Sequence, residues 1–580
     1  MVRRLIPLVM LSSLAGCSLF EPDPETWGMP EDQRGRAENA KFETLVDAYL
    51  AWHYAAHPVR ATLDGIHEYD DRLQDVSAAA IAAEIGAQRR WLERVRSVKP
   101  VLLAEDAEID RRLLESSIQA ALLDLEEVRS WERDPGFYGG IVSEGLYALA
   151  ALRFAPPERR MAMAVERLAQ VGGVLEAARA NLKNPPGLLT ELAIDDFSGA
   201  KAFIADSLPQ ALAEVKDDAL RKRFDARRRE TVASLESFVQ WLRSDLAPRS
   251  TGAVALGESL FRRKLALEEM VETPVDALLA QGEALLEATR AKMVEVARSI
   301  DAAKPPAEVL RDTAAEHPKA EELLDAVRAM LDGLKKASRE RLFEVPPDAD
   351  CKVQETPAFR RGTSFASMEI PGPFETVARD AYYSVTLPEA SWDPARREQH
   401  LRFFNRHALK LISVHEAYPG HYTQFLTLRG LPSKVRRVFG SGAFAEGWAH
   451  YLEEAYVDEV EPGDPKLRLH QLNMALLRIC RYLVALRMHC RGMTVEEAAR
   501  FFEERGLQER ANAEREARRG AADPMYLVYT LGKIEILRLR EECRAAWSDA
   551  FSLKLFHHRL LATGYPPLKL ARKLLLRLPD

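Results

Sequence analysis

Two short segments of the sequence carry the side chains best suited to metal chemistry. The first reads Val414-His-Glu-Ala-Tyr-Pro-Gly-His-Tyr422, and the second reads Phe444-Ala-Glu-Gly-Trp-Ala-His-Tyr-Leu-Glu453. A hydrolytic zinc site needs about three nitrogen or carboxylate ligands, one position left for water, and a carboxylate that takes the proton of that water. The His-Glu pair, the second histidine and a glutamate of the later segment supply these four groups.

The spacing of the two histidines predicts a break in the helix that carries them. His421 lies six residues after His415, and on an unbroken α-helix this spacing turns the two side chains about 120° apart. Pro419 cannot bond the carbonyl of His415, and its ring clashes with that carbonyl. Gly420 accepts backbone angles closed to other residues. We therefore expect a bulge or break at Tyr418 to Gly420 that returns His421 to the face of His415.

The chain resembles the DUF885 family, whose members share a His-Glu-x-x-Pro-Gly-His signature and belong with the gluzincin-type metallopeptidases. The matching residues are His415, Glu416, Pro419, Gly420 and His421, the segment Glu446–Tyr451, and the segments 523–533, 551–557 and 564–568. The resemblance is specific from about residue 355 to residue 570 and loosely helical before that. It implies a largely helical body with a deep cleft, a single zinc ion and hydrolysis of peptides.

The resemblance also implies a role for each residue of the set. His415 and His421 would bind zinc through imidazole nitrogen, and Glu446 would complete the protein ligands. Glu416 would be the general base on a zinc-bound water. The alternative is that the histidines are coincidental surface residues and that Glu446 is an acid on a helix face. The agreement of three separate segments with one mechanism favours the zinc site.

Three further residues are candidates for a part in the reaction. His450 lies one helical turn after Glu446, so it could orient a ligand or donate to the substrate oxyanion, and a structural histidine is the alternative. Tyr526 and Tyr529 are candidates for hydrogen bonding in the transition state, by similarity to helical zinc peptidases that use a tyrosine there. Packed core tyrosines are the alternative for this pair.

Basic residues near the end of the chain could hold the C-terminal carboxylate of a peptide. The candidates are Lys533 and Arg538, together with Arg540. A solvated helix face is the commoner environment of such charges. The remaining histidines of this region are interpreted as structural: His470, His489, His557 and His558.

The N-terminus is typical of a secreted bacterial lipoprotein. Arg3 and Arg4 precede an apolar run at 5–11, which is too short to span a membrane. The sequence Leu14-Ala-Gly-Cys17 resembles a lipobox, which implies a signal peptide at 1–16 and a lipidated Cys17. An ordinary cleaved signal is the alternative. Ser18 favours the outer membrane, by similarity to lipoprotein sorting rules.

The rest of the composition fits a body held outside the membrane by that anchor. Residues 17–40 are rich in proline and acid and are expected to form a tether. No later segment has 18 consecutive apolar residues, and the formal net charge of -7 argues against a nucleic-acid partner. Disulfides are possible in an oxidising envelope, but we expect buried free thiols. The cysteines concerned are Cys351, Cys480, Cys490 and Cys543.

Hydrophobic periodicity predicts a mostly α fold. Amphipathic helices dominate from about residue 41 to 340, and prolines interrupt every helical pattern between about 345 and 390. The segment Ala381-Tyr-Tyr-Ser-Val-Thr-Leu387 has the composition of a strand. We predict a two-lobed body, with an N-terminal helical lobe at 41–344, a zinc-peptidase lobe at 345–580, a deep central cleft and a small β element beside the zinc.

These expectations combine into a zinc-dependent peptidase anchored in the cell envelope, on the outer membrane or on a membrane facing the periplasm, that hydrolyses short peptides. The alternative is an inactive lipoprotein of the same fold that binds peptides without cutting them, although such a binder has no need of Glu416. A serine hydrolase is a weaker reading, since the sequence contains no G-x-S-x-G.

Overall fold

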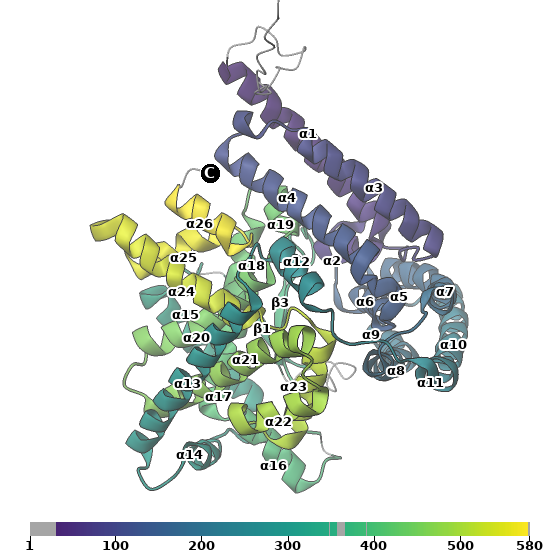
Figure 1. Cartoon of the computed structure of the whole chain (residues 1–580). Helices are drawn as coiled ribbons and strands as arrows, with labels where there is room; N and C mark the ends of the chain where they lie inside the picture. Colours follow the sequence, from purple (N-terminus) through teal and green to yellow (C-terminus); the bar gives the residue numbers. More distant parts are fainter. Residues whose placement is uncertain (1–30, 347–348, 357–365, 390, 578–580) are drawn as a thin grey trace, which may run out of the picture.

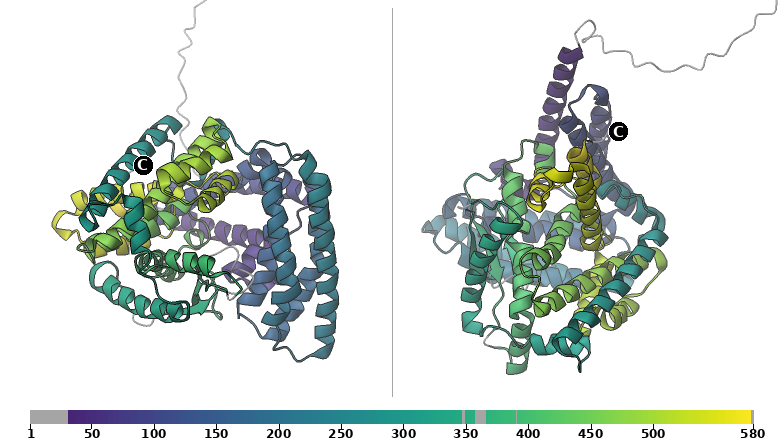
Figure 2. Two further views of the ribbon diagram at one scale, coloured as in Figure 1. Left: turned by 90° about the horizontal axis from the view of Figure 1, so that it is seen from below. Right: turned by 90° about the vertical axis from the view of Figure 1, so that its left-hand side faces the viewer.

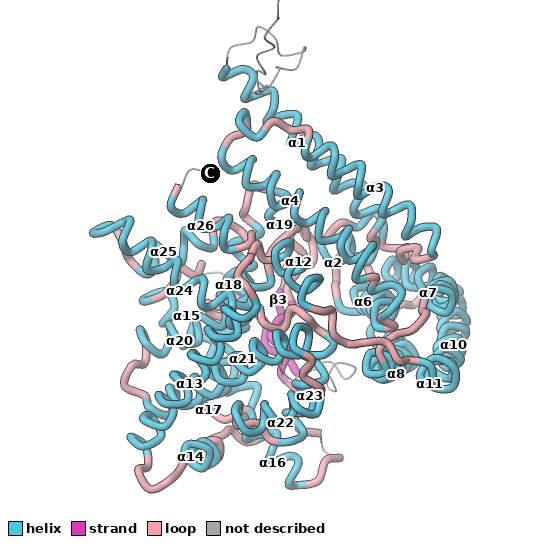
Figure 3. Tube along the Cα trace, viewed as in Figure 1, coloured by secondary structure: helices cyan, strands magenta, loops and turns pink. Residues whose placement is uncertain are grey.

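The computed structural model describes residues 31–346, 349–356, 366–389 and 391–577 (Figure 1). Helices make up nearly all of the regular structure in this part of the chain, and its three strands form one small sheet (Figure 3). The predicted mostly α fold with a small β element is therefore confirmed. Among the described residues, no helix combines the length and apolar character that a membrane span requires.

The N-terminal helices form two adjoining groups. α1, α3 and α4 run side by side, and α6, α7, α8 and α10 pack around a core of their own (Figures 1 and 2). Side-chain caps start two of these described helices: Ser77 accepts from the backbone N–H of Ala80 before α3, and Asp217 accepts from that of Leu220 before α10. The helices are α1 (Glu31–Ala56), α2 (Pro58–Asp64), α3 (Ala78–Arg96), α4 (Glu105–Leu123), α5 (Ser130–Arg133), α6 (Gly136–Ala151), α7 (Pro157–Asn181), α8 (Gly187–Ala202), α9 (Leu208–Ala211), α10 (Asp218–Trp241) and α11 (Ala247–Arg249).

The remaining helices surround the sheet. They are α12 (Glu258–Glu268), α13 (Val275–Ile300), α14 (Pro306–Thr313), α15 (Leu323–Arg341), α16 (Pro394–Phe403), α17 (Arg406–Glu416), α18 (His421–Arg429), α19 (Lys434–Val438), α20 (Gly442–Glu459), α21 (Pro465–Arg491), α22 (Val495–Gly506), α23 (Arg510–Ala522), α24 (Val528–Trp547), α25 (Leu553–Leu561) and α26 (Leu568–Leu576). α13 packs along α21, where Gly282 fits against Tyr482 and Leu483. The division of the chain into domains stays a prediction.

The sheet supports the helix that carries the first histidine. Its strands are β1 (Cys351–Glu355), β2 (Ala366–Glu369) and β3 (Ala381–Val385), in the order β1-β3-β2. β3 pairs in parallel with β1, from Cys351 opposite Ala381, and antiparallel with β2. The buried Tyr383 places its hydroxyl 3.2 Å from the hydroxyl of Ser413 on α17. The strand expected at 381–387 is thus confirmed as the central strand.

Two glycines allow a very close crossing of α20 and α24. A Cβ at Gly447 of α20 would overlap the backbone of Gly532 on α24, and a Cβ at Gly532 would overlap the carbonyl of Ala443. Only glycine allows two helix backbones to approach so closely. The crossing therefore fixes the position of α20, which carries Glu446, against α24.

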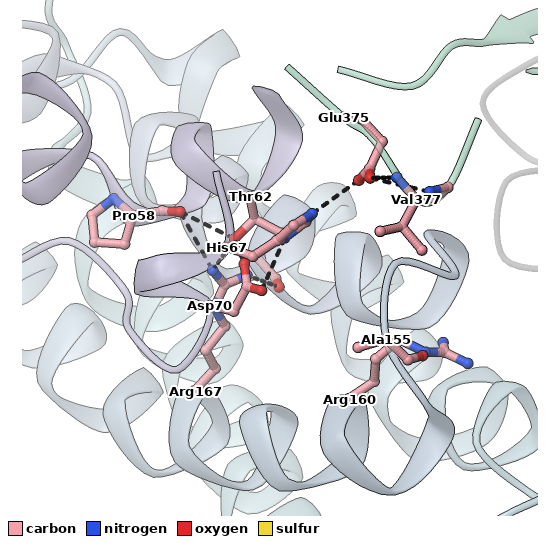
Figure 4. A network of polar contacts seen from close by, with 11 residues as sticks. Pro58, Thr62, His67, Asp70, Ala155, Arg160, Arg167, Glu375 and Val377 are labelled. Atoms are coloured by element: carbon pink, nitrogen blue, oxygen red, sulfur yellow. Dashed lines mark hydrogen bonds and ion pairs between the residues drawn. The ribbon is translucent and has the colours of Figure 1, made fainter. Parts of the chain in front are cut away.

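A polar network joins the N-terminal helices to the segment between β2 and β3 (Figure 4). His67 lies in the short turn η2 (His67–Tyr69), which follows α2. Its Nδ1 is 3.0 Å from Asp70, and its Nε2 is 2.9 Å from Glu375. The fully buried Arg167 donates to Thr62 beside this turn. Because His67 and Glu375 are far apart in the sequence, their contact joins the N-terminal helices to the segment between β2 and β3.

The cysteine and N-terminal predictions have different outcomes. Free thiols are confirmed for all four cysteines, of which Cys480 and Cys543 are buried as expected, whereas Cys351 and Cys490 are only half-buried. The predicted signal peptide, Cys17 and the first part of the tether lie outside the described residues. α1 begins at Glu31, inside the stretch assigned to the tether.

Candidate metal centre

The loop between α17 and α18 brings the two histidines together. α17 ends at Glu416, and α18 begins at His421, so the predicted break is confirmed. The Tyr418–Pro419 peptide bond is cis. A Cβ at Gly420 would overlap the carbonyl of His415, so only glycine fits here. As a result, the imidazole rings of His415 and His421 lie 4.8 Å apart between centroids.

α20 adds a carboxylate to the pair. Glu446 Oε2 is 3.4 Å from Nε2 of His415 and 3.6 Å from Nε2 of His421. One donor atom from each of the three residues lies within 4.8 Å of the others. Neither contact has the geometry of a hydrogen bond, and Oε2 is buried without a hydrogen-bond partner in the described residues. Two imidazoles and a carboxylate are a typical catalytic zinc set, and a cation would satisfy this oxygen.

The outward nitrogens of both imidazoles are also held. His415 Nδ1 donates to Glu453 Oε1 at 2.8 Å, and His421 Nδ1 donates to Gln424 Oε1 at 2.9 Å. A hydrogen bond at one ring nitrogen determines the tautomer and leaves the other nitrogen free to bind a metal. Both free nitrogens, the two Nε2 atoms, face Glu446. The donor set and its support therefore fit zinc.

Glu453 is the centre of a buried ionic network behind His415. Its side chain is fully buried, with Arg478 at 2.8 Å and Nδ1 of His450 at 3.1 Å. Burial raises the pKa of Glu453, but Arg478 and His450 lower it more, so the pKa lies well below its usual range. The carboxylate is thus kept ionised, as an acceptor for His415 requires.

The electrostatics of the centre favour a cation. Burial lowers the pKa of His421, but the carboxylates of Glu446 and Glu416 outweigh it and raise that pKa to about 9. Burial alone would raise the pKa of Glu446, whereas the two histidines hold it well below its usual range. Metal binding needs both imidazoles in the neutral form. The negative charges of Glu446 and Glu416 are then not balanced by the imidazoles, so a cation is favoured.

Glu416 lies beside the ligand set without belonging to it. It is the last residue of α17, half-buried, and its charge raises the pKa of both His421 and the buried Tyr383. The group of atoms that could hold a metal does not include it. A carboxylate next to the ligands is the arrangement that a general base requires.

The model of the family described as "Bacterial protein of unknown function (DUF885)" matches residues 58–575, nearly the whole described chain. The chain belongs to the DUF885 family. A candidate lipoprotein of unknown function from Shewanella oneidensis is 25% identical, with a TM-score of 0.79 over 92% of this chain and 99% of that chain. A candidate lipoprotein from Colwellia psychrerythraea shares the fold at 16% identity, with a TM-score of 0.77 over 95% of this chain and 99% of that chain. No curated protein matches the chain.

In this DUF885 protein the two candidate tyrosines have different surroundings. The fully buried Tyr526 donates to Glu516, which Arg481 also contacts at 2.7 Å. Tyr529 lies one turn before Gly532 and accepts from Arg519 at 3.1 Å. Burial raises the pKa of Tyr529 most, and the charge of Glu446 is the next cause. Tyr529 is therefore the tyrosine beside the centre.

The other candidate residues are placed around the centre or away from it. His450 lies behind His415, where burial and then Lys533 lower its pKa to about 3, so it can orient Glu453 as a neutral ring. Lys533 pairs with Glu454 at 2.5 Å, and the exposed Arg538 pairs with Glu535 at 2.9 Å. The structure brings neither Lys533 nor Arg538 to His415 or His421. Their role in binding a substrate stays a prediction.

Several supporting residues of the DUF885 centre were missed by the sequence reasoning. Glu453 lies two helical turns after Glu446, and Gln424 lies one turn after His421, so helical spacing could have indicated both. Trp448 donates to the carbonyl of Pro419 at 3.0 Å and anchors the loop. Arg478 comes from α21, and no local pattern signals its contact.

The predicted deep cleft stays a prediction. Two surface cavities of about 510 and 490 Å³ lie elsewhere, one between α15 and α17 and one beside α12. The side chains of His421 and Glu446 are 19% and 29% exposed. The DUF885 centre is thus partly exposed to solvent at the side chains of His421 and Glu446.

Proposed function

We propose that this protein is a zinc-dependent peptidase anchored in the cell envelope, related to the gluzincins, which hydrolyses short peptides. The observation that supports it best is the group formed by His415, His421 and Glu446, with an unsatisfied buried oxygen on Glu446 and the carboxylate of Glu416 beside it. Two of the solved structures that match are of candidate lipoproteins, which supports an anchor at Cys17.

Each residue of the centre has a separate role in the proposed hydrolysis. When bound, zinc supplies Lewis acidity, which polarises a carbonyl group and makes water more acidic. The two histidines and Glu446 hold the ion, and Glu453 keeps His415 in the tautomer that can bind it. Glu416 accepts the proton of the attacking water and passes it to the leaving amine. In this proposal the hydroxyl of Tyr529 donates to the developing oxyanion, which its proximity to Glu446 supports.

The decisive experiment replaces Glu416 by glutamine. The amide keeps the size of the side chain but accepts no proton at neutral pH. We expect one zinc per chain to remain while kcat falls about 10²- to 10⁴-fold, the usual worth of a general base. Metal analysis and digestion of a mixed peptide library measure the two effects on the same preparation.

Two further variants serve as controls. His415→Ala and Glu446→Ala should lose zinc and activity together, since each removes a ligand. Lost zinc in Glu416→Gln would make Glu416 a ligand, and normal kcat there would place the chemistry elsewhere. Wild-type protein that holds one zinc and cuts no peptide would favour the second candidate, a peptide-binding lipoprotein of this fold.

A further inference from the structure

Three guanidinium groups act on the hydroxyl of Tyr529, and only one of them lacks an acidic partner. Arg478 contacts Glu453 at 2.8 Å, and Arg481 contacts Glu516 at 2.7 Å. Arg519 forms no ion pair within 4.0 Å among the described residues, although the charge of Glu516 acts on it from a greater distance. Because Arg519 is exposed and forms no ion pair with a described residue, its guanidinium is available to a ligand.

Arg519 is held in place from one side. One of its terminal nitrogens donates to Tyr529 at 3.1 Å, and its guanidinium lies 4.8 Å from the ring centre of the buried Tyr526. The residue as a whole is exposed. A guanidinium has five N–H donors, and the described residues accept from only one of them. The others are free to bind an acceptor from outside the chain.

The helix crossing places this arginine next to the metal centre. Glu446 immediately precedes Gly447, and Tyr529 lies three residues before Gly532. Because the two glycines touch, Tyr529 is close to Glu446, and Arg519 lies one hydrogen bond beyond Tyr529. A peptide whose scissile bond lies at Glu446 would therefore reach Arg519 with the part of its chain on that side.

We propose that Arg519, aligned by Tyr529, binds the C-terminal carboxylate of the peptide substrate, so that the enzyme acts on peptides with a free carboxyl end. The planar guanidinium matches a carboxylate with two parallel hydrogen bonds. Lys533, the cation that the sequence suggested for this task, is already paired with Glu454. This inference rests on the proposed peptidase function and adds the class of substrate to it.

The test compares a pentapeptide library with free carboxyl ends with the same library as C-terminal amides. The wild type should cut the free acids at least about tenfold more efficiently, because a charge-assisted pair is lost in the amides. Arg519→Gln should lose this preference, chiefly through a higher KM for the acids, so that it cuts acids and amides about equally well. Arg519→Lys should recover part of it.

The adjacent Arg518 provides a matched control. It is already paired with Glu191 at 3.1 Å, so Arg518→Gln should keep the full preference for free acids. Equal cutting of acids and amides by the wild type would overturn the inference. So would an undiminished preference in Arg519→Gln.

A binding measurement keeps the inference testable if no peptide is cut. Chelator-treated protein is dialysed to equilibrium against both libraries, and the bound peptides are counted by mass spectrometry. Tighter retention of the acids, lost in Arg519→Gln and kept in Arg518→Gln, supports the carboxylate subsite even where the proposed hydrolysis fails. Equal retention of acids and amides overturns it.

Discussion

At the scale of single residues, the orientation of His415 depends on a carboxylate that touches no substrate. Glu453 receives the Nδ1–H of His415 and is kept ionised by Arg478, while His450 occupies its other oxygen. Such outer hydrogen bonds fix the ring that binds the metal and raise its basicity. The affinity for zinc should therefore depend on Glu453 almost as strongly as on the ligands.

Glu453→Gln is expected to weaken zinc binding about 10- to 100-fold. It also leaves Arg478 without its buried partner, which should lower the free energy of unfolding by about 3–5 kcal/mol. Competition with a chelator measures the first effect, and denaturant unfolding measures the second. Glu454→Gln is the control, because it breaks the neighbouring ion pair with Lys533 without touching His415. Unchanged zinc affinity in folded Glu453→Gln would contradict the role of Glu453 in orienting His415.

The candidate ligand set could be predicted from the sequence because its members lie in short motifs whose residue types and spacing suggest a metal site. His415, Glu416 and His421 share one segment, and the loop that joins them is signalled by Pro419 and Gly420. The surroundings were less readable. The pairing of a cation depends on contacts between distant segments, so Lys533 looked free in the sequence and Arg519 did not stand out.

At the scale of helices, the centre depends on how closely α20 approaches α24. Gly447 and Gly532 touch at the crossing, with Glu446 on one side of the contact and Tyr529 on the other. A side chain at either glycine has to push the helices apart, because backbone atoms occupy the space it would need. The distance from Glu446 to the histidines would change with it.

Gly532→Ala should therefore destabilise the protein by about 1–3 kcal/mol through overpacking and should weaken zinc binding as well. Gly333→Ala in α15 is the matched control: its new methyl group meets nothing within 4 Å, and the helix should gain about 0.4–1 kcal/mol. Denaturant unfolding and zinc titration of both variants test this. An alanine tolerated at 532 with full zinc affinity would show that the crossing does not set the centre.

At the scale of the whole molecule, the N-terminal helices and the segment before β3 are joined through His67 (Figure 4). Burial lowers the pKa of His67, but its contacts with Asp70 and Glu375 outweigh this effect and raise it above 6.5. Burial raises the pKa of Glu375, while the backbone N–H of Val377 and then His67 lower it, to a net value below 4.5. At pH values between the pKa of Glu375 and the pKa of His67, both side chains of this bridge are therefore charged.

The directions of these two pKa shifts determine how the free energy of unfolding depends on pH. A raised pKa on His67 contributes fully below its unfolded value of about 6.5 and is lost as the pH rises through the folded value. The lowered pKa of Glu375 contributes above about 4.3 and is lost as the pH falls through its folded value. His67→Gln should cost about 1–3 kcal/mol near pH 6 and much less at pH 9. Denaturant unfolding across this range checks it, and an equal cost at both pH values would contradict the bridge.

The proposed anchor in the cell envelope depends on Cys17. Cys17→Ser removes the thiol that would accept the lipid, so the variant should lose fatty-acid label and leave the membrane fraction. Growth with labelled fatty acid, followed by fractionation, measures both. Undiminished label in the variant would contradict the anchor. Zinc content and peptide hydrolysis should stay as in the wild type, since the centre lies in another part of the chain.

The fold was predictable in class and less so in arrangement. Helical periodicity gave the helices, and the β-branched and aromatic composition of 381–387 gave the central strand. The partners of these elements depend on contacts that no periodicity records. α13 packs on α21, nearly 200 residues later, because Gly282 leaves room for Tyr482. Patterns of hydrophobicity show which face of a helix is buried, but they do not show which other element that face packs against.

The touching glycines of α20 and α24 also offer a way to sort relatives. The match from Shewanella oneidensis shares the fold at 25% identity, so most positions can change without loss of shape. Gly447 and Gly532 are different, because a larger residue there would move Glu446 of the candidate metal centre. A genome survey could therefore use this pair, together with the histidine signature, to separate members that keep a working centre from those that have drifted into other roles.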